Sequence, residues 1–294
     1  DLITPAQKFK VGPYVYRKDR GYAFERQLDR NTRGYLNKQL REYGADERMA
    51  RIPLMFFGSV VSRDGRKMLI STQPLRFLMQ APGDTADNRP ADPDLVDFGS
   101  FFSDQDPYGL RLLTALRMNA TFPVVLPNVW LPSEPVIDVM DAGLRDNYGL
   151  ETSLRFLFAM DDWVRRNTSG ILLIQIRDRM SGGWENPYVS ENMGQQAVRP
   201  FFLLQYNWFK MMEYSQQELL KFYTSYSGHN VYSVSFHYQA EKPERKAPLN
   251  FHLSRREARE ILASIRWDQN HQSAMRVKQL LEQRPAPGPF DLFR

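Results

Sequence analysis

The sequence predicts an α/β fold in which helices pack on a mostly parallel sheet, and two observations carry this prediction. An apolar strand at 135–143 is followed by Asp146-Asn147, which can cap a helix, and then by a helix that stops near residue 167. The next strand, at 171–176, is apolar except for Gln175 and is of the kind found in buried strands. A strand, a helix and a strand joined by short links are typical of a parallel βαβ unit.

Composition places the chain among globular proteins and excludes several kinds of site. Its 294 residues are 42% hydrophobic and 25% charged, which excludes collagen-like and wholly disordered chains. The absence of cysteine excludes disulfides, cysteine-ligated zinc, iron–sulfur clusters and a thiol nucleophile. Lys and Arg exceed Asp and Glu by 39 − 34 = 5, but the basic residues are dispersed, so we expect no nucleic-acid partner.

Residues 1–50 are polar and mixed, and we expect them to form a helical connecting segment. Apolar side chains recur at near-helical spacing over Tyr22–Tyr43, which predicts a helix there. The chain begins at Asp1 and not at Met, so we expect it to be a fragment of a longer protein.

The next segment predicts a β-hairpin. Two apolar runs of strand length, 52–61 and 67–72, flank the pair Asp64-Gly65, which favours a tight turn with positive φ. Residues 80–108 are rich in turn-forming side chains and are expected to be a loop, and 110–118 reads as a short helix.

The last third of the chain predicts mostly helices. A long helix is expected from about 201 to 226, followed by a strand at 231–237. Ser254 has the position of an N-cap, and Glu257 three residues later completes a capping box. We therefore expect one helix or a helix pair over 254–283.

Asp141 is the strongest candidate for a functional side chain. It ends the apolar strand and is followed by the small residues Ala142 and Gly143, and loops at the carboxyl ends of strands line the functional crevice of open α/β sheets. The alternative is that this carboxylate only orders its own turn, and spacing does not separate the two interpretations.

Other kinds of site have little support in the sequence. There is no glycine-rich phosphate loop, and the four histidines are scattered without metal-ligand spacing, so no cofactor and no metal are expected. The loop 180–189 leaves the strand 171–176 at its carboxyl end. Trp184 and Tyr188 in this loop are candidates for a lid over a bound ligand, with Gly182-Gly183 as its hinge. The alternative is an ordinary surface loop with two aromatic side chains packed inward.

Three segments, in order, carry a family resemblance. The stretch 139–149 (VMDAGLRDNYG) resembles the aspartate motif of patatin-like phospholipases, Asp-Gly-Gly or Asp-Gly-Ala followed by Leu, two residues and Asn. The stretch 118–129 is similar to that family's segment Ala-Ser…Pro…Phe-Pro-Pro-Val, and the hairpin at 52–72 resembles the strand pair before it. The resemblance covers roughly residues 50–180.

The chain departs from the family pattern at four points. The motif here is Asp-Ala-Gly, and Asn119-Ala120 stand where the family has Ala-Ser. The Gly-x-Ser-x-Gly motif of the family's nucleophile is absent, its nearest approximation being Gly58-Ser59 within an expected strand, and there is no triple-glycine oxyanion loop.

The resemblance implies a three-layer sandwich with helices on both faces of the sheet, incomplete at its N-terminal side. It divides the chain into a connecting segment at 1–50, half of the α/β core at 51–180 and a helical extension at 181–294. It implies a Ser–Asp dyad with Asp141 as the base in a turn shaped by Ala142, Gly143 and Asn147. The serine would come from residues that precede this chain, which alone is expected to be inactive.

The implied activity is hydrolysis of phospholipid or acylglycerol esters. The alternatives are a non-catalytic lipid-binding or scaffold module on the same fold, and acyl transfer, which uses the same acyl-enzyme. The implied partners are a lipid ester, a membrane surface contacted peripherally, and either the preceding portion of the protein or an oligomer partner that covers exposed sheet edges.

Overall fold

The computed structural model describes residues 7–80, 92–121, 128–178, 193–238, 240 and 253–283, without the side chains of Arg20 and 193–206. The chain divides into two units. The first comprises residues 1–159 and 211–216, and the second comprises 160–210 and 217–294. The expected division at residues 50 and 180 stays a prediction.

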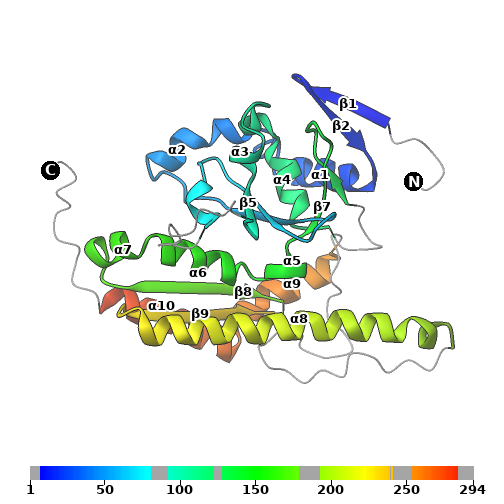
Figure 1. Ribbon diagram of the computed structural model, residues 1–294. Coiled ribbons are helices and arrows are strands. Elements are labelled where there is room, and N and C mark those ends of the chain that lie inside the picture. The colour runs from blue at the N-terminus through cyan, green and yellow to red at the C-terminus, as the bar shows by residue number, and fades with distance from the viewer. Residues whose placement is uncertain are drawn as a thin grey trace. The chain divides into compact units, whose positions relative to one another are not determined.

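The first unit is mixed α/β (Figure 1). Its strands are β1 (Gln7–Val11), β2 (Tyr14–Lys18), β3 (Phe57–Val61), β4 (Lys67–Ile70), β5 (Leu95–Asp97), β6 (Val129–Trp130) and β7 (Asp138–Asp141). Its helices are α1 (Arg20–Asn31), η1 (Leu40–Glu42), α2 (Gly44–Arg48), η2 (Arg76–Leu78), α3 (Phe98–Phe101), η3 (Pro107–Gly109), α4 (Leu112–Met118), α5 (Gly143–Asp146) and α6 (Leu150–Ala159).

Five strands of this unit form one sheet in the order β5-β4-β3-β7-β6. Only β4 and β5 are parallel, and the other three neighbouring pairs are antiparallel. The α/β class is confirmed, whereas this sheet is mixed and not mostly parallel as expected. The central strand β3 contacts α4 and α5, so helices pack against the strand that lies beside Asp141.

The hairpin β3–β4 is confirmed. Val60 lies opposite Lys67, and the connecting turn closes with a hydrogen bond from the Gly65 N–H to the Val61 carbonyl (2.9 Å). Gly65 has φ of +77°, a conformation that residues with a side chain rarely adopt, which explains the glycine after Asp64.

The predicted parallel βαβ unit over 135–176 does not form. Strand β7 pairs antiparallel with both β3 and β6, whereas 171–176 belongs to β8 (Ile171–Arg177), in another sheet. The prediction failed because a short apolar run does not show whether its partner is parallel or antiparallel. The helix expected up to residue 167 also breaks at Met160, after which Asp161 and Asp162 begin a new helix, where acidic side chains are favourable.

The N-terminal segment is only partly helical. Residues 7–18 form the hairpin β1–β2, and α1 begins at its N-cap Asp19, which accepts from the Tyr22 N–H (3.0 Å). The helix expected to reach Tyr43 ends at Asn31, because the chain turns through Arg33 and Gly34, both at positive φ.

Buried charges join α1 to α4 in the first unit. Glu25 on α1 accepts from Arg111 (2.7 Å) and Thr114 (3.3 Å) and lies 3.7 Å from Arg117. Arg117 donates in turn to Asp19 (2.6 Å). Burial raises the pKa of Glu25 above its usual range, although both arginines oppose this shift. The interior of this unit therefore includes ion pairs between residues about ninety positions apart.

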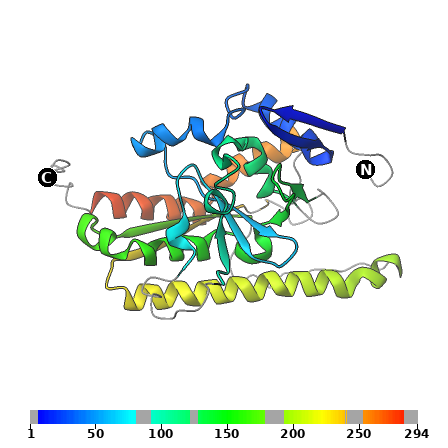
Figure 2. The same ribbon diagram turned by 45° about the horizontal axis from the view of Figure 1, so that its top comes forward.

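The second unit contains α7 (Asp161–Asn167), β8, α8 (Met193–Tyr226) except its residues 211–216, β9 (Val231–His237), α9 (Arg255–Ala263), η5 (Ser264–Arg266) and α10 (Asp268–Glu282). Strands β8 and β9 are parallel and in register from Ile171–Val231 to Arg177–His237. Figures 1 and 2 show α10, in red, running alongside these strands. The predicted long helix, the strand at 231–237 and the C-terminal helix pair are confirmed, as is the capping box of Ser254 and Glu257.

An amide side chain covers the outer edge of β9. Asn270 of α10 accepts from the His237 N–H (3.0 Å) and donates to the His237 carbonyl (2.8 Å), as a neighbouring strand would. Ser273 donates to the Ser235 carbonyl (2.8 Å). In the described part of the chain, no helix combines the length and the apolar character that crossing a bilayer demands.

Replacing Glu25 by Ala should lower the free energy of unfolding by about 3–5 kcal/mol, because Arg111 and Arg117 would remain buried without their shared carboxylate. Denaturant unfolding measures this change. The control is Glu218→Ala on α8, whose exposed pair with Lys221 should contribute less than about 1 kcal/mol. Equal losses for the two variants would contradict a structural role for the buried network.

Candidate active site

Asp141 is the last residue of β7, and its side chain is half-buried. Its Oδ1 accepts a hydrogen bond of 2.5 Å from the Gly143 N–H. Burial raises the pKa of Asp141 to about 6, against which this hydrogen bond acts. Among the described residues, no arginine or lysine forms an ion pair with Asp141, so its carboxylate is not neutralised by a neighbouring cation in that part of the chain.

Gly143 is required in the turn after β7 because its neighbours leave no space for a side chain. A Cβ at this position would lie 2.7 Å from the Asp141 Oδ1 and 2.7 Å from the Asn147 Oδ1. The structure thus brings Asp141, Gly143 and Asn147 together, as the sequence predicts. Ala142 lies against β3, since a Cβ on Gly58 would be 3.1 Å from the Ala142 Cβ.

A buried ion cluster fixes the end of this turn. Asp146 accepts from the Glu151 N–H (3.1 Å), the Thr152 N–H (2.8 Å) and the Thr152 hydroxyl (2.7 Å), which confirms its predicted capping role. Lys67 of β4, only 3% exposed, lies 3.5 Å from Asp146 and 2.8 Å from Glu151. Lys67 could not be recognised from the sequence, because an isolated lysine in an apolar strand does not reveal its partners.

Segments far apart in the sequence meet beside Asp141. In the β3–β7 register Ser59 lies directly opposite Asp141, and the neighbouring Gly58 N–H donates to the Asn119 Oδ1 (3.1 Å). The Asn119 amide nitrogen donates to the Ala115 carbonyl of α4 (2.9 Å). The hairpin β3–β4, Asn119 and the turn that follows Asp141 therefore meet at the end of β7.

Ser59 has the wrong environment for a nucleophile. It is 1% exposed, and its hydroxyl donates to the Met68 carbonyl across the hairpin (3.4 Å). A serine that attacks an ester needs both access to the substrate and hydrogen-bond contact with its base. The described residues thus place a carboxylate at this point without a serine hydroxyl that a ligand could reach.

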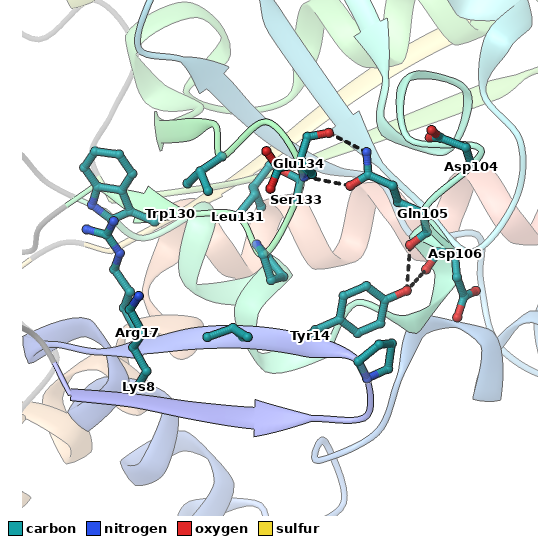
Figure 3. A pocket seen from close by; sticks show the side chains of 14 residues that line it. Lys8, Tyr14, Arg17, Asp104, Gln105, Asp106, Trp130, Leu131, Ser133 and Glu134 are labelled. Atoms are coloured by element: carbon teal, nitrogen blue, oxygen red, sulfur yellow. Dashed lines mark hydrogen bonds between the residues drawn. The ribbon is translucent and has the colours of Figure 1, made fainter.

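A separate cavity of about 570 Å³ lies in the first unit, and Asp141 does not line it (Figure 3). The guanidinium of Arg17 stacks on Trp130, 4.3 Å from the ring centroid. The Tyr14 hydroxyl donates to the Gln105 carbonyl (2.7 Å) and the Asp106 carbonyl (2.5 Å). Figure 3 shows Arg17 and Trp130 at one end of the cavity and Gln105 and Asp106 at the other.

The remaining predicted site residues lie outside the described part of the chain. Trp184, Tyr188 and the hinge pair Gly182-Gly183 all fall within 179–192, so the lid stays a prediction. The described residues contain no group of three or more His, Asp or Glu side chains arranged to hold a metal ion.

Comparisons with models of protein families, with curated proteins and with solved structures found no match to this chain.

Replacing Asp141 by Asn should stabilise the protein at pH 8. Because the folded-state pKa is about 6 and the usual value is 3.8, ionising this carboxyl weakens the fold as pH rises from about 4 to 6. At about 1.4 kcal/mol per pKa unit, the variant's free energy of unfolding should exceed that of the wild type by roughly 2–3 kcal/mol at pH 8, and this difference should vanish near pH 4. Urea unfolding at several pH values measures it.

Asp94→Asn is the control, because its stability at pH 8 should change in the opposite direction. The hydrogen bonds from Arg145 (2.7 and 2.9 Å) lower the pKa of Asp94, so its ionised form supports the fold above the usual pKa. This variant should therefore be less stable than the wild type at pH 8. A stability difference for Asp141→Asn that does not change with pH would contradict the burial of an ionisable carboxyl.

Gly143→Ala should destabilise the protein by about 1–3 kcal/mol, because the new Cβ meets two oxygen atoms at 2.7 Å. In an Asn147→Ala background, where one of these atoms is gone, the same change should cost less. Denaturant unfolding of the four proteins in this double-mutant cycle measures the coupling. A coupling of zero would show that Asn147 and Gly143 do not share this space.

Proposed function

We propose that this chain carries the general base of a lipid acyl hydrolase of the patatin-like type, acting on phospholipid or acylglycerol esters. The observation that supports it is the half-buried carboxylate of Asp141 at the end of β7. Its raised pKa of about 6 suits a group that must accept a proton near neutral pH. The proposal includes the family's three-layer sandwich, of which this chain supplies the aspartate-bearing part.

In the proposed reaction Asp141 takes the proton of a serine hydroxyl while the serine oxygen attacks the ester carbonyl. Asp141 gives this proton to the oxygen of the leaving alcohol, and an acyl-serine ester remains. Water then attacks this ester and gives up a proton to Asp141, which returns it to the serine oxygen as the fatty acid is released. The Gly143 N–H bond to Oδ1 fixes the orientation of the carboxylate during both proton transfers.

The serine must come from outside this sequence in the proposed reaction. These 294 residues contain no Gly-x-Ser-x-Gly, and Ser59 is buried and bonded to Met68. We propose that a preceding portion of the same protein, or an oligomer partner, brings the nucleophile and the N–H groups that stabilise the oxyanion. Trp184 and Tyr188 would cover the acyl chain at a membrane surface contacted peripherally.

A non-catalytic lipid-binding module on the same fold is the second proposal. The observation that favours it is the burial of Ser59, the serine directly opposite Asp141 in the sheet. A module of this kind would bind lipid whether or not position 141 can accept a proton.

Ester hydrolysis by the full-length protein should fall about 10³- to 10⁴-fold in kcat on Asp141→Asn, because the amide cannot accept the serine proton. A fluorogenic acyl ester and phospholipid vesicles are suitable substrates. The control is Asp138→Asn on the same strand, where the carboxylate accepts from Asn128 (3.0 Å), and its rate should stay near that of the wild type.

Vesicle binding by the same proteins separates the two proposals. Binding by Asp141→Asn together with lost hydrolysis supports the hydrolase. Lipid binding without any hydrolysis by the wild-type protein supports the module, and equal hydrolysis by wild type and Asp141→Asn rules out Asp141 as the base.

A further inference from the structure

The second unit contains a cavity of about 480 Å³ with an unusual lining. Two arginines, one histidine, three serines, two glutamines and one valine line it, so the described lining carries two positive charges and no carboxylate. Cavities of this volume commonly hold small ligands. This composition therefore favours a negatively charged ligand.

Strand β9 forms one wall of this cavity. Ser233, Ser235 and His237 alternate along the strand and so point to the same face. Arg177, at the end of β8, is the register partner of His237 and is 4% exposed. Its Nη1 donates to the Gln175 Oε1 (3.0 Å), which holds this guanidinium beside the serines.

Helix α10 forms the other wall. Gln269, Gln272 and Arg276 are three and four residues apart and therefore share one side of the helix. The helix is fixed to β9 by Asn270, which bonds the backbone of His237, and by Ser273, which bonds the Ser235 carbonyl. The two walls are thus joined directly by hydrogen bonds.

The lining presents donors to its interior. The Ser233 hydroxyl oxygen accepts from Gln175 (3.3 Å), which leaves its own proton to donate. The His237 Nε2 lies 2.8 Å from the Gln269 Oε1, so the amide nitrogen of Gln269 is left to donate elsewhere. Arg276 donates from Nη1 to the Gln279 Oε1 (2.9 Å), and its remaining N–H groups add further donors to the cavity lining.

We propose that this cavity between β9 and α10 binds a phosphate-bearing anion. A phosphate offers several acceptor oxygens and negative charge, which match two guanidinium groups and a ring of hydroxyl and amide donors. A cation would find no carboxylate among the described lining residues. This site is independent of Asp141 and of the proposed hydrolysis.

The test is binding of inorganic phosphate and of phosphatidic acid vesicles by the full-length protein. Titration calorimetry measures the first, and cosedimentation against phosphatidylcholine vesicles measures the second. Arg276→Gln should weaken binding about 10- to 100-fold, as expected for the loss of charge-assisted hydrogen bonds. Lys278→Gln, which removes an exposed charge of α10 outside the cavity lining, should leave binding unchanged. Circular dichroism confirms that both variants fold.

Each outcome decides the proposal. Phosphate binding that Arg276→Gln weakens and Lys278→Gln does not supports a soluble phosphate as the ligand. Binding of phosphatidic acid alone, with the same dependence on Arg276, assigns the phosphate to a lipid headgroup. No binding of either, or binding that both variants reduce equally, overturns the proposal. Asp141→Asn should bind like the wild type, so a failed hydrolase assay does not affect this result.

Discussion

The pairing of β3 with two neighbours is the constraint on which the site depends. Its hydrogen bonds to β4 on one side and to β7 on the other place Ser59 opposite Asp141. The Gly58 N–H, at the edge of the β7 pairing, reaches Asn119 and so ties the sheet to α4. A slip of one residue in this register would turn every side chain of β7 to the other face. The orientation of the Asp141 carboxylate is therefore set by backbone pairing before any side chain contributes.

Elements that depend on neighbouring residues could be predicted from the sequence. The turn at Asp64-Gly65 requires positive φ at its glycine, and the caps at Asp146 and Ser254 satisfy N–H groups only a few residues away. Pairings between distant segments could not be predicted. The antiparallel pairing of β7 with β3 and the contact of Glu25 with Arg111 join positions 78 or more residues apart, and no short sequence pattern predicts such contacts.

The candidate site shows the same division. Small residues after Asp141 indicated a tight turn, and Gly143 and Asn147 do pack against its carboxylate. The raised pKa of Asp141 follows from burial. Burial depends on the packing of the whole sheet, so the local sequence motif does not predict this shift. The cavity lined by Arg177 and Arg276 had a weak signal, the alternation of Ser233, Ser235 and His237 along an otherwise apolar strand.

The bonds of Asn270 to the backbone of His237 have a consequence for self-association. An amide that occupies both backbone groups of an edge residue prevents another chain from docking there by strand addition. Among the described residues, β8 pairs only with β9, so growth of this small sheet has a single direction, away from α10. A strand added beside β8 would lie next to Ile174 and Ile176, whose exposed side chains suit an apolar neighbour.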